Sequence, residues 1–507
     1  MYDNEVDLCL RFTLEQLKER TPDVIVGNLG YMFELAREAG NKDLLEHGIS
    51  LANQLKIDSW DKNIQCLYHY NIANAYSYKK QLSSDPNSIS FWDDSIMHEI
   101  RHLRLAYNLS YAADEMLASK IRVNLGNLFS HVGRWPEAYS LWRESLDIVP
   151  DFYMALGNIG KGLRTYAPLL DSWIDQTIYY VSAKCALEKA LIVINDDEPY
   201  YPLFQGLLNE LNSFLPDKLK SVERWEYLNL PLTVIESQTD DERAYRKWIT
   251  NNGYLLSPLN VIDHSKDVGD TILLPTHIQN KELYPGFYLR LFNQIKQEYA
   301  TARFLIYEGV VREDIHMSDH GNILAEIDYQ TDYSYNIECL KSGFRLLYSI
   351  FDKIALFINQ YFNMGFSAEE VTFKKLWMKK DKRGNYIIRD SILATQNWPL
   401  SGIFWVSRDL FSLDLNIVDP DSEGIPEIRN YLEHKGVSVD VSDWEEQYGI
   451  LHISRGMLIA KCGKLLSLTR ESIINLAFAV KLHEMRRVDK SGFIPMDYSI
   501  MDDERKI

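Results

Sequence analysis

The chain has 507 residues, of which 46% are apolar and 12% aromatic, and its formal net charge is −18 at pH 7. This length and composition exclude a disordered chain and predict two or three domains with hydrophobic cores. The five cysteines are odd in number, lie far apart and form no CxxC or Cys/His cluster, which indicates a reducing cytosol and argues against a zinc site.

The sequence contains no pattern typical of export or of membrane insertion. No apolar run approaches the roughly 18 residues that span a bilayer, and the N-terminal "MYDNEVDLCLRF" lacks the basic start and apolar core of a signal peptide. We therefore expect a cytoplasmic protein with no membrane partner. The negative charge argues against indiscriminate binding of nucleic acid, because affinity for phosphate depends on Lys and Arg. Any contact with nucleic acid must be local.

The N-terminal part, residues 1–215, is predicted to consist of helical repeats. The segment "NLGNLFSHVGRWPEAYSLWRESLDIVP" places small and large residues, such as Gly126 and Trp142, at the offsets of the tetratricopeptide pattern. Gly160 follows Gly126 by 34 residues, the period of that repeat. The resemblance implies that small residues let two antiparallel helices approach while large ones fill the groove between them. It predicts about four helical pairs, and an irregular helical bundle is the alternative.

Repeats of this kind bury their apolar faces by stacking, and the stack leaves a concave surface suited to a peptide or protein partner. We therefore expect a recognition or regulatory module. His98 and His102 stand at i, i+4 spacing, which is compatible with a metal site, but no carboxylate or third ligand is placed to complete one. The sequence favours a solvated helix face for this pair.

Residues 216–334 are expected to form a connector. Prolines become frequent, in "LNLPLTV", "LSPLNVID" and "LLPTHIQNKELYPGF", and helical periodicity becomes patchy, with one clear helix from about residue 283 to 300. The segment is not rich in Gly and Ser, so a packed bridge is expected rather than a flexible linker.

Residues 335–490 return to long helices and precede a C-terminal tail, residues 491–507. The segment "YNIECLKSGFRLLYSIFDKIALFINQYFNMG" repeats apolar residues at helical spacing, as a core-facing stripe does. Two more helices are expected at 401–413 and 455–487. These elements predict an all-α fold: N-terminal tetratricopeptide-like repeats, a packed connector and a C-terminal helical bundle with one short polar helix inserted.

The short helix is expected in "GIPEIRNYLEHKG", residues 424–436. Asp421 or Ser422 can cap its start, Pro426 suits its first turn, and Gly436 is placed to end it. Such clear end signals predict a separate helix between its longer neighbours.

Three polar residues, Arg429, Asn430 and His434, stand on this helix. Successive residues rotate by about 100° around a helix axis, so Asn430 and His434 share a stripe while Arg429 and His434 diverge by about 140°. The last turn favours a protonated histidine, because the helix dipole is negative there. A surface ion pair between Arg429 and Glu433 is the alternative role for the arginine.

The helix in its setting resembles the HEPN domain, the small helical domain of many prokaryotic and some eukaryotic ribonucleases. The family signature is Arg, four to six residues, then His, usually with a polar residue directly after the Arg. Arg429, Asn430 and His434 fit all three positions, and the resemblance covers roughly residues 335–490. Its pairing with tetratricopeptide-like repeats resembles proteins of bacterial antiphage defence. Gly436 stands where some toxin members carry a Tyr that an antitoxin modifies, so neutralisation by that route is not expected.

The resemblance implies a metal-independent endoribonuclease that needs no cofactor. RNA carries its own nucleophile, the 2′-hydroxyl, so cleavage requires an acid/base and a cation for the charge that builds on phosphorus. His434 would be the acid/base, Arg429 the cation, and Asn430 would orient the phosphate or the imidazole. Members of the family are typically dimeric, which implies a homodimer or higher oligomer with two motifs facing one cleft.

RNA needs a docking surface on this acidic protein, and the segment "TFKKLWMKKDKRGNY" offers a local one. Trp377 and Tyr386 are interleaved with its cations as expected stacking platforms. A solvated loop is the alternative, and Asp352 is a weaker candidate as a supporting residue of the site. The predicted RNA-binding residues are Lys374, Lys375, Lys379, Lys380, Lys382 and Arg383.

A non-catalytic protein is the competing class. In that case the HEPN-like domain would only bind RNA or nucleotide, or serve as a protein-interaction scaffold. An intact Arg429 and His434 pair favours the ribonuclease, a toxin or abortive-infection effector controlled through its repeats.

Overall fold

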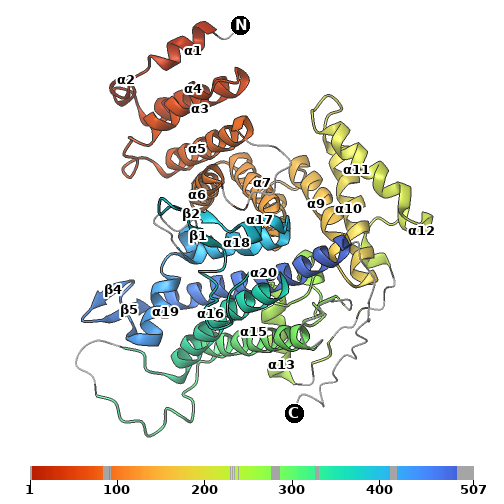
Figure 1. The fold of residues 1–507 in the computed structure, drawn as a ribbon, viewed down its shortest axis with the longest axis vertical. Helices are drawn as coiled ribbons and strands as arrows, with labels where there is room; N and C mark the ends of the chain where they lie inside the picture. Colours follow the sequence, from red (N-terminus) through yellow and green to blue (C-terminus); the bar gives the residue numbers. More distant parts are fainter. Residues whose placement is uncertain are drawn as a thin grey trace. The chain divides into compact units, whose positions relative to one another are not determined.

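The computed structural model describes residues 3–83, 91, 93–228, 230, 232, 235–237, 239–275, 286–325, 331–411 and 419–487. α-Helices make up most of these residues (Figure 1), which confirms the predicted all-α class. None of the described helices carries an apolar stretch long enough to cross a membrane.

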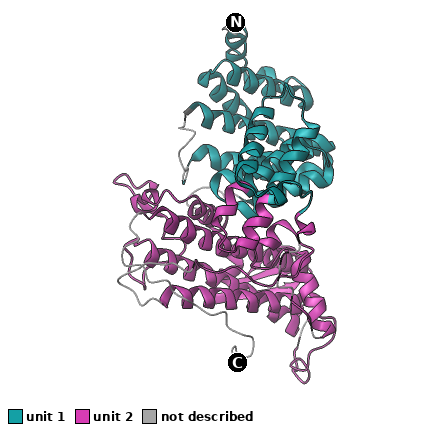
Figure 2. Ribbon diagram, turned by 90° about the vertical axis from the view of Figure 1, so that its right-hand side faces the viewer, with its two compact units in different colours: residues 1–163, 181–224, 412–420 teal, residues 164–180, 225–411, 421–507 magenta. Residues whose placement is uncertain are grey.

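The chain divides into two compact units, coloured teal and magenta in Figure 2. Helices α9 and α10 each contribute residues to both. Unit 1 comprises Met1–Leu163, Val181–Arg224 and Ser412–Pro420, and unit 2 comprises Arg164–Tyr180, Trp225–Phe411 and Asp421–Ile507.

Unit 1 is built from helices that follow one another along the chain. In order they are α1 (Asp3–Leu10), α2 (Leu14–Lys18), α3 (Pro22–Glu38), α4 (Lys42–Ala52), α5 (Lys62–Ser83), α6 (Asp94–Leu109), η1 (Ser110–Ala112), α7 (Glu115–Val132), α8 (Trp135–Ile148), α9 (Tyr153–Tyr166), α10 (Trp173–Val193), α11 (Tyr201–Phe214) and α12 (Asp217–Lys220).

Neighbouring helices of unit 1 pack as pairs, as the sequence predicts. Between α7 and α8, a Cβ added to Gly126 would lie 2.6 Å from Trp142 Nε1. Between α9 and α10, a Cβ added to Gly160 would lie 2.5 Å from Leu187 Cγ. Both glycines therefore let two helices approach closely. The helical pairs are observed, while their tetratricopeptide type remains a prediction.

The expectation of a solvated face around His98 and His102 is wrong. His98 stacks on Tyr76 with ring centroids 4.5 Å apart, and His102 Nδ1 lies 3.0 Å from His69 Nδ1. Burial lowers the pKa of His69 to about 4 and that of His102 to about 3. Helix α5 covers this face, so the histidines are packed and uncharged near neutral pH.

Unit 2 contains the longer helices and two small sheets. Its elements are η2 (Ala167–Leu169), η3 (Trp225–Tyr227), α13 (Asp240–Asn251), α14 (Leu259–Ile262), α15 (Phe287–Val311), α16 (Tyr335–Tyr361), β1 (Met378–Lys380), β2 (Tyr386–Ile388), α17 (Asp390–Ala394), α18 (Trp398–Leu410), α19 (Ile425–His434), β3 (Gly436–Asp440), β4 (Glu445–Gln447), β5 (Ile450–Ser454) and α20 (Arg455–Arg486). The short turn η4 (Pro420–Ser422) has its first residue in unit 1 and its other two in unit 2.

The predicted apolar stripe of α16 lies in the core of unit 2. Gly309 of α15 and Gly343 of α16 let these two helices approach, since an added Cβ would lie within 2.7 Å of the facing helix at either position. The stripe residues are all at most 1% exposed: Leu340, Phe344, Leu347, Ile350, Phe351, Ile354, Phe357 and Ile358.

Two small sheets depart from the purely helical bundle that was expected. Strands β1 and β2 form an antiparallel hairpin, and a three-stranded sheet of order β3-β5-β4 lies between α19 and α20 in the chain. The strands are three to five residues long, too short for a recognisable alternation of polar and apolar residues. The proposed domain boundaries at 215, 334 and 490 remain predictions, and the tail, 491–507, lies outside the described residues.

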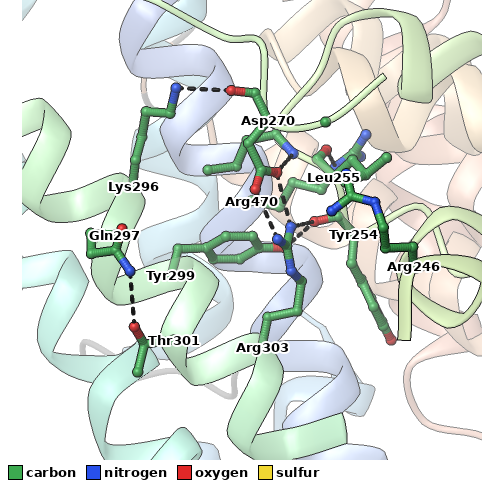
Figure 3. Close-up of polar contacts among 12 residues, drawn as sticks. Arg246, Tyr254, Leu255, Asp270, Lys296, Gln297, Tyr299, Thr301, Arg303 and Arg470 are labelled. Carbon is green, nitrogen blue, oxygen red and sulfur yellow. Dashed lines mark hydrogen bonds and ion pairs between the residues drawn. The ribbon is translucent and has the colours of Figure 1, made fainter. Parts of the chain in front are cut away.

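A buried polar network joins distant segments of unit 2 (Figure 3). Arg303 of α15 donates two hydrogen bonds, of 2.9 and 2.8 Å, to the carboxylate of Asp270. Arg303 and Tyr299 also donate to the backbone carbonyl of Tyr254, and Arg470 of α20 donates to that of the next residue. Burial raises the pKa of Asp270, but Arg303 outweighs it and holds the pKa below its usual value.

Candidate active site

Helix α19 begins and ends sharply. Gly424 precedes it with φ of 84°, and a Cβ there would lie 2.3 Å from Trp444, so glycine is required twice over. Pro426 stands in the first turn as predicted. The caps expected at Asp421 or Ser422 are wrong, because both belong to the preceding turn η4, and Gly436 does not terminate the helix but opens strand β3.

The three motif residues lie where helical rotation places them. Asn430 and His434 are exposed, and their side chains make no hydrogen bond or ion pair with the part of the chain that the structure describes. Arg429 is half-buried on the flank of the buried face, which is formed by Ile425, Ile428, Tyr431 and Leu432. The arginine and the histidine therefore diverge, and a single helix does not bring them together.

Arg429 is held against α16. Its Cζ lies 5.6 Å from the centre of the Tyr348 ring, a cation–π contact, and no ion pair joins it to Glu433 among the described residues. Burial raises the pKa of Tyr348, while the positive charge of Arg429 opposes the rise. The contact holds the guanidinium against the ring at the flank of α19.

The C-terminal end of α19 is also fixed by α16. Arg345 Nη2 donates a hydrogen bond of 2.7 Å to the carbonyl of Leu432, one of the carbonyls that no residue of α19 can satisfy. The cation also complements the negative end of the helix dipole. Two contacts from α16, at Tyr348 and Arg345, therefore set the position of the motif.

The predicted RNA-binding segment forms the loop before β1, the strand itself and the β1–β2 turn. Lys374, Lys375, Lys380, Lys382 and Arg383 are exposed. Lys379 is half-buried and forms an ion pair with Asp390, so it is a weaker candidate for contact with phosphate.

The stacking role expected for Trp377 is wrong. Its side chain is 1% exposed and packs edge-on against Phe373 and Phe404 in the core. Lys380 Nζ lies 5.2 Å from the centre of the half-buried Tyr386 ring, so that aromatic surface is already partly covered by a cation. The segment presents charge to solvent, with little aromatic surface.

The cationic segment is tied to the same helix that holds Arg429. Asp352 Oδ1 accepts a hydrogen bond of 2.9 Å from the backbone N of Phe373, directly before Lys374. Tyr348 and Asp352 stand one helical turn apart on α16. The arginine of the motif and the first lysines of the segment are thus anchored on neighbouring turns of one helix.

Sequence reasoning missed Arg345 and Tyr348. Together with Asp352 they stand at spacings of three and four residues, which places all three on one stripe of α16. A polar stripe beside a fully apolar one was the available signal. The partners of Arg345 and Tyr348 on α19 are more than 80 residues away in the chain, so only the fold reveals them.

Residues 280–483 match the model of a family described as LA2681-like HEPN. This part of the chain resembles a HEPN domain. The match runs from before α15 to near the end of α20 and contains the whole motif on α19. Searches of curated proteins and of solved structures gave no match. The matched residues begin before residue 335 and include α15, which packs along α16.

Proposed function

We propose that this protein is a metal-independent endoribonuclease that cleaves RNA by attack of the 2′-hydroxyl. The observation that carries the proposal is the state of α19 within the HEPN-like region. Asn430 and His434 are exposed and have no partner among the residues that the structure describes, and Arg429 is held at the flank by Tyr348. Polar groups left unpaired beside a fixed cation suit a ligand that carries negative charge.

The residues divide the chemistry between them. His434 exchanges a proton with the reacting hydroxyl groups, Arg429 stabilises the charge on the phosphoryl oxygens, and Asn430 orients phosphate or imidazole. The products are a 2′,3′-cyclic phosphate and a 5′-hydroxyl. The exposed cations of the segment from Lys374 to Arg383 would hold the flanking backbone of the RNA, which the net charge of −18 otherwise repels.

A homodimer would complete the site. Arg429 and His434 diverge on one helix, whereas a two-fold axis through the HEPN-like region would set the arginine of one chain beside the histidine of the other. Mixed dimers of Arg429→Ala and His434→Ala chains would then recover part of the activity, because one complete pair forms across the interface.

The repeats of unit 1 are proposed to control the enzyme. An unrestrained ribonuclease in the cytoplasm would damage its own cell, and a stack of helical pairs presents an extended surface for a protein or peptide partner. A toxin or abortive-infection effector in antiphage defence fits this pairing of domains.

The test is cleavage of labelled cellular RNA by purified protein in EDTA. We expect Arg429→Ala and His434→Ala each to reduce the rate at least about 100-fold. Glu433→Ala, on the same exposed surface, should cleave like the wild type. Folding should be unchanged in all three, since these side chains are not core residues.

Two results would contradict the proposal: a strict requirement for a divalent ion, or full activity of His434→Ala. RNA binding without cleavage by the wild type would favour the alternative, a non-catalytic RNA-binding or interaction scaffold.

A further inference from the structure

A buried ion pair of unit 1 lies only a few residues before the helix of the motif. Arg104 stands on α6, and Asp419 is the residue directly before η4; both belong to unit 1. Nη2 of Arg104 lies 3.6 Å from Oδ2 of Asp419, and the two side chains are 5% and 0% exposed. Such a pair is strongly held together, because removal of either partner leaves an unpaired charge in the interior.

Arg104 belongs to a cluster of four charged side chains. Glu137 forms ion pairs with both Arg104 and Arg134. The two guanidinium groups lie against the ring of Phe129, with each Cζ less than 5 Å from its centre, at 4.7 and 4.6 Å. Glu137 supplies one negative charge for the two arginines, and Asp419 supplies a second. The aspartate is therefore part of the charge balance of unit 1, although it comes from a distant part of the chain.

The link from Asp419 to α19 is short and well packed. Five residues separate Asp419 from the first residue of α19, and three of them form η4. The carbonyl of Asp421 accepts a hydrogen bond of 2.9 Å from Nζ of Lys461. Ser422 is fully buried, and Gly424 has no room for a side chain. A displacement of Asp419 is therefore passed on to the start of α19.

The position of this start matters for the motif. The contacts from α16 hold the later part of α19, at Arg429 and at the carbonyl of Leu432. Asp419 acts at the opposite end, ahead of the first turn. Because a helix of ten residues moves as one body, a tilt at its start moves Arg429 and His434 together. Reacting groups need to stay within about 0.5 Å of their working geometry, and a misplacement of about 1 Å can cost about 100-fold in rate.

We propose that Asp419 is a positioning residue of the candidate site, which ties the start of α19 to Arg104 of unit 1. This inference rests on the proposed function. It also gives the repeats a route to the enzyme, since a protein partner that displaces α6 would displace Arg104 and with it Asp419. The motif is in its working position while the pair is formed, so loss of the pair lowers the rate of cleavage.

The test compares two full-length variants that each remove one negative charge from beside Arg104. Asp419→Asn breaks the pair at the link to α19, whereas Glu137→Gln should leave Arg104 paired with Asp419. On an RNA oligonucleotide with one cleavage site, we expect Asp419→Asn to lower kcat at least about 10-fold and to leave KM within about two-fold. KM should hold because the proposed RNA-binding segment, from Lys374 to Arg383, is anchored on α16 and not on α19.

Glu137→Gln is the matched control. It weakens the same cluster, so unit 1 should unfold at a lower urea concentration than in the wild type in both variants. The kcat of Glu137→Gln should nevertheless stay within about two-fold of the wild-type value. Hydrogen exchange adds a measurement that does not depend on cleavage. The amides of α19 should exchange at least about five-fold faster in Asp419→Asn, and at the wild-type rate in Glu137→Gln.

An equal loss of kcat in the two variants would mean that the cluster only stabilises unit 1, and it would overturn the inference. Wild-type kcat in Asp419→Asn, or unchanged exchange in α19, would overturn it as well. A wild type that cleaves no RNA would overturn the proposed function, and exchange in α19 would then decide the link separately. Faster exchange in Asp419→Asn alone would support the link to unit 1, and unchanged exchange would overturn it.

Discussion

The two units differ in the sequence separation of the contacts that hold their cores together. In unit 1 many close contacts join neighbouring helices, as between Gly126 and Trp142. In unit 2 the contacts that fix the core join segments far apart, such as Arg470 and Leu255, which are 215 residues apart. A stack of local pairs leaves a repeat in the sequence, whereas contacts between distant segments leave no repeat that would identify the partners.

Both units also bury titratable groups. Unit 1 buries ion pairs of its own, such as Arg104 with Asp419, and it buries histidines in addition. Unit 1 buries histidines whose pKa is lowered by burial, so they are packed as neutral rings. Unit 2 buries an ion pair, Arg303 with Asp270, whose side chains are 4% and 24% exposed. Acid protonates buried neutral histidines and thereby lowers the free energy of unfolding. A buried ion pair lowers it most when one partner is removed, because the other charge is left unpaired.

The largest expected effect comes from removing one member of the buried pair. Asp270→Ala leaves Arg303 buried without its counter-ion and removes the acceptor for the backbone N of Leu256. We expect a loss of about 3–5 kcal/mol in the free energy of unfolding of unit 2. Urea titration with hydrogen exchange in α15 and α16 measures it.

The matched control for this prediction is Asp240→Ala. Asp240 pairs with Arg243 in the same unit, but its side chain is 91% exposed, so the loss should stay below about 1 kcal/mol. Equal losses for the two variants would show that burial does not distinguish these pairs. Loss of protection in α7 and α8 as well would contradict the separation of the units.

The second effect tests the local packing of unit 1. Gly126→Ala places a methyl group against Trp142 and should cost about 1–3 kcal/mol, because the helices of the α7–α8 pair must separate. Gly27→Ala, on α3, meets no atom within 4 Å and should be neutral or stabilising by about 0.5–1 kcal/mol. Thermal unfolding followed by hydrogen exchange in α7 and α8 compares them, and indistinguishable variants would argue against tight packing at this pair.

These contrasts explain which features of the fold could be predicted. The apolar stripe of α16 and the helical pairs of unit 1 follow from periodicity, and both are present in the structure. The small sheets were missed because strands of three to five residues carry too little pattern. Trp377 was misplaced because a basic neighbourhood says nothing about whether an aromatic ring faces the core or the solvent.

In the candidate site, too, local patterns could be predicted from the sequence and contacts between elements could not. The residues on α19 could be chosen from one short stretch, because the family signature and helical rotation are both local. Arg345 and Tyr348 depend on contacts between elements, and no spacing rule within one element reveals them. The roles assigned to Arg429, Asn430 and His434 remain proposals until the variants are assayed.

The third expected effect is a loss of stability of unit 1 at acidic pH. For His69 and His102 the pKa in the folded state is lowered to about 4 and about 3, so their stabilising contribution is present above about pH 6.5 and is lost as the pH falls through these values. Between pH 7 and pH 5 each histidine should cost unit 1 about 2 kcal/mol, because the unfolded chain takes up the proton first.

His102→Gln should remove about 2 kcal/mol of that pH dependence, whatever it does to stability at pH 7. Urea titrations at pH 7 and pH 5, followed by hydrogen exchange in α5 and α6, measure the difference. The His98→Gln variant is a weaker control, since the pKa of His98 is also lowered by burial. An unchanged slope in His102→Gln would mean that the pair already binds a proton in the folded state.

The smallest expected effect is a pH dependence of stability in unit 2 that has the opposite sign to that of unit 1. Burial raises the pKa of Asp175 to about 6, so the carboxyl stabilises the fold below about pH 4 and loses that contribution as the pH rises through 6. Asp175 lines a cavity of about 170 Å³ that is also lined by Asp171 and Lys481. Asp175→Asn should therefore stabilise unit 2 by about 1 kcal/mol at pH 7. This gain is smaller than the full shift of the pKa implies, because the Asp175 side chain keeps some contact with solvent and stands in the first turn of α10. The gain should vanish at pH 4.

Asp171→Asn is the matched control in the same cavity. It removes a 2.6 Å ion pair with Lys481 and should be neutral or slightly destabilising. A gain in stability from both variants would mean that the excess negative charge, and not the burial of Asp175, sets the effect.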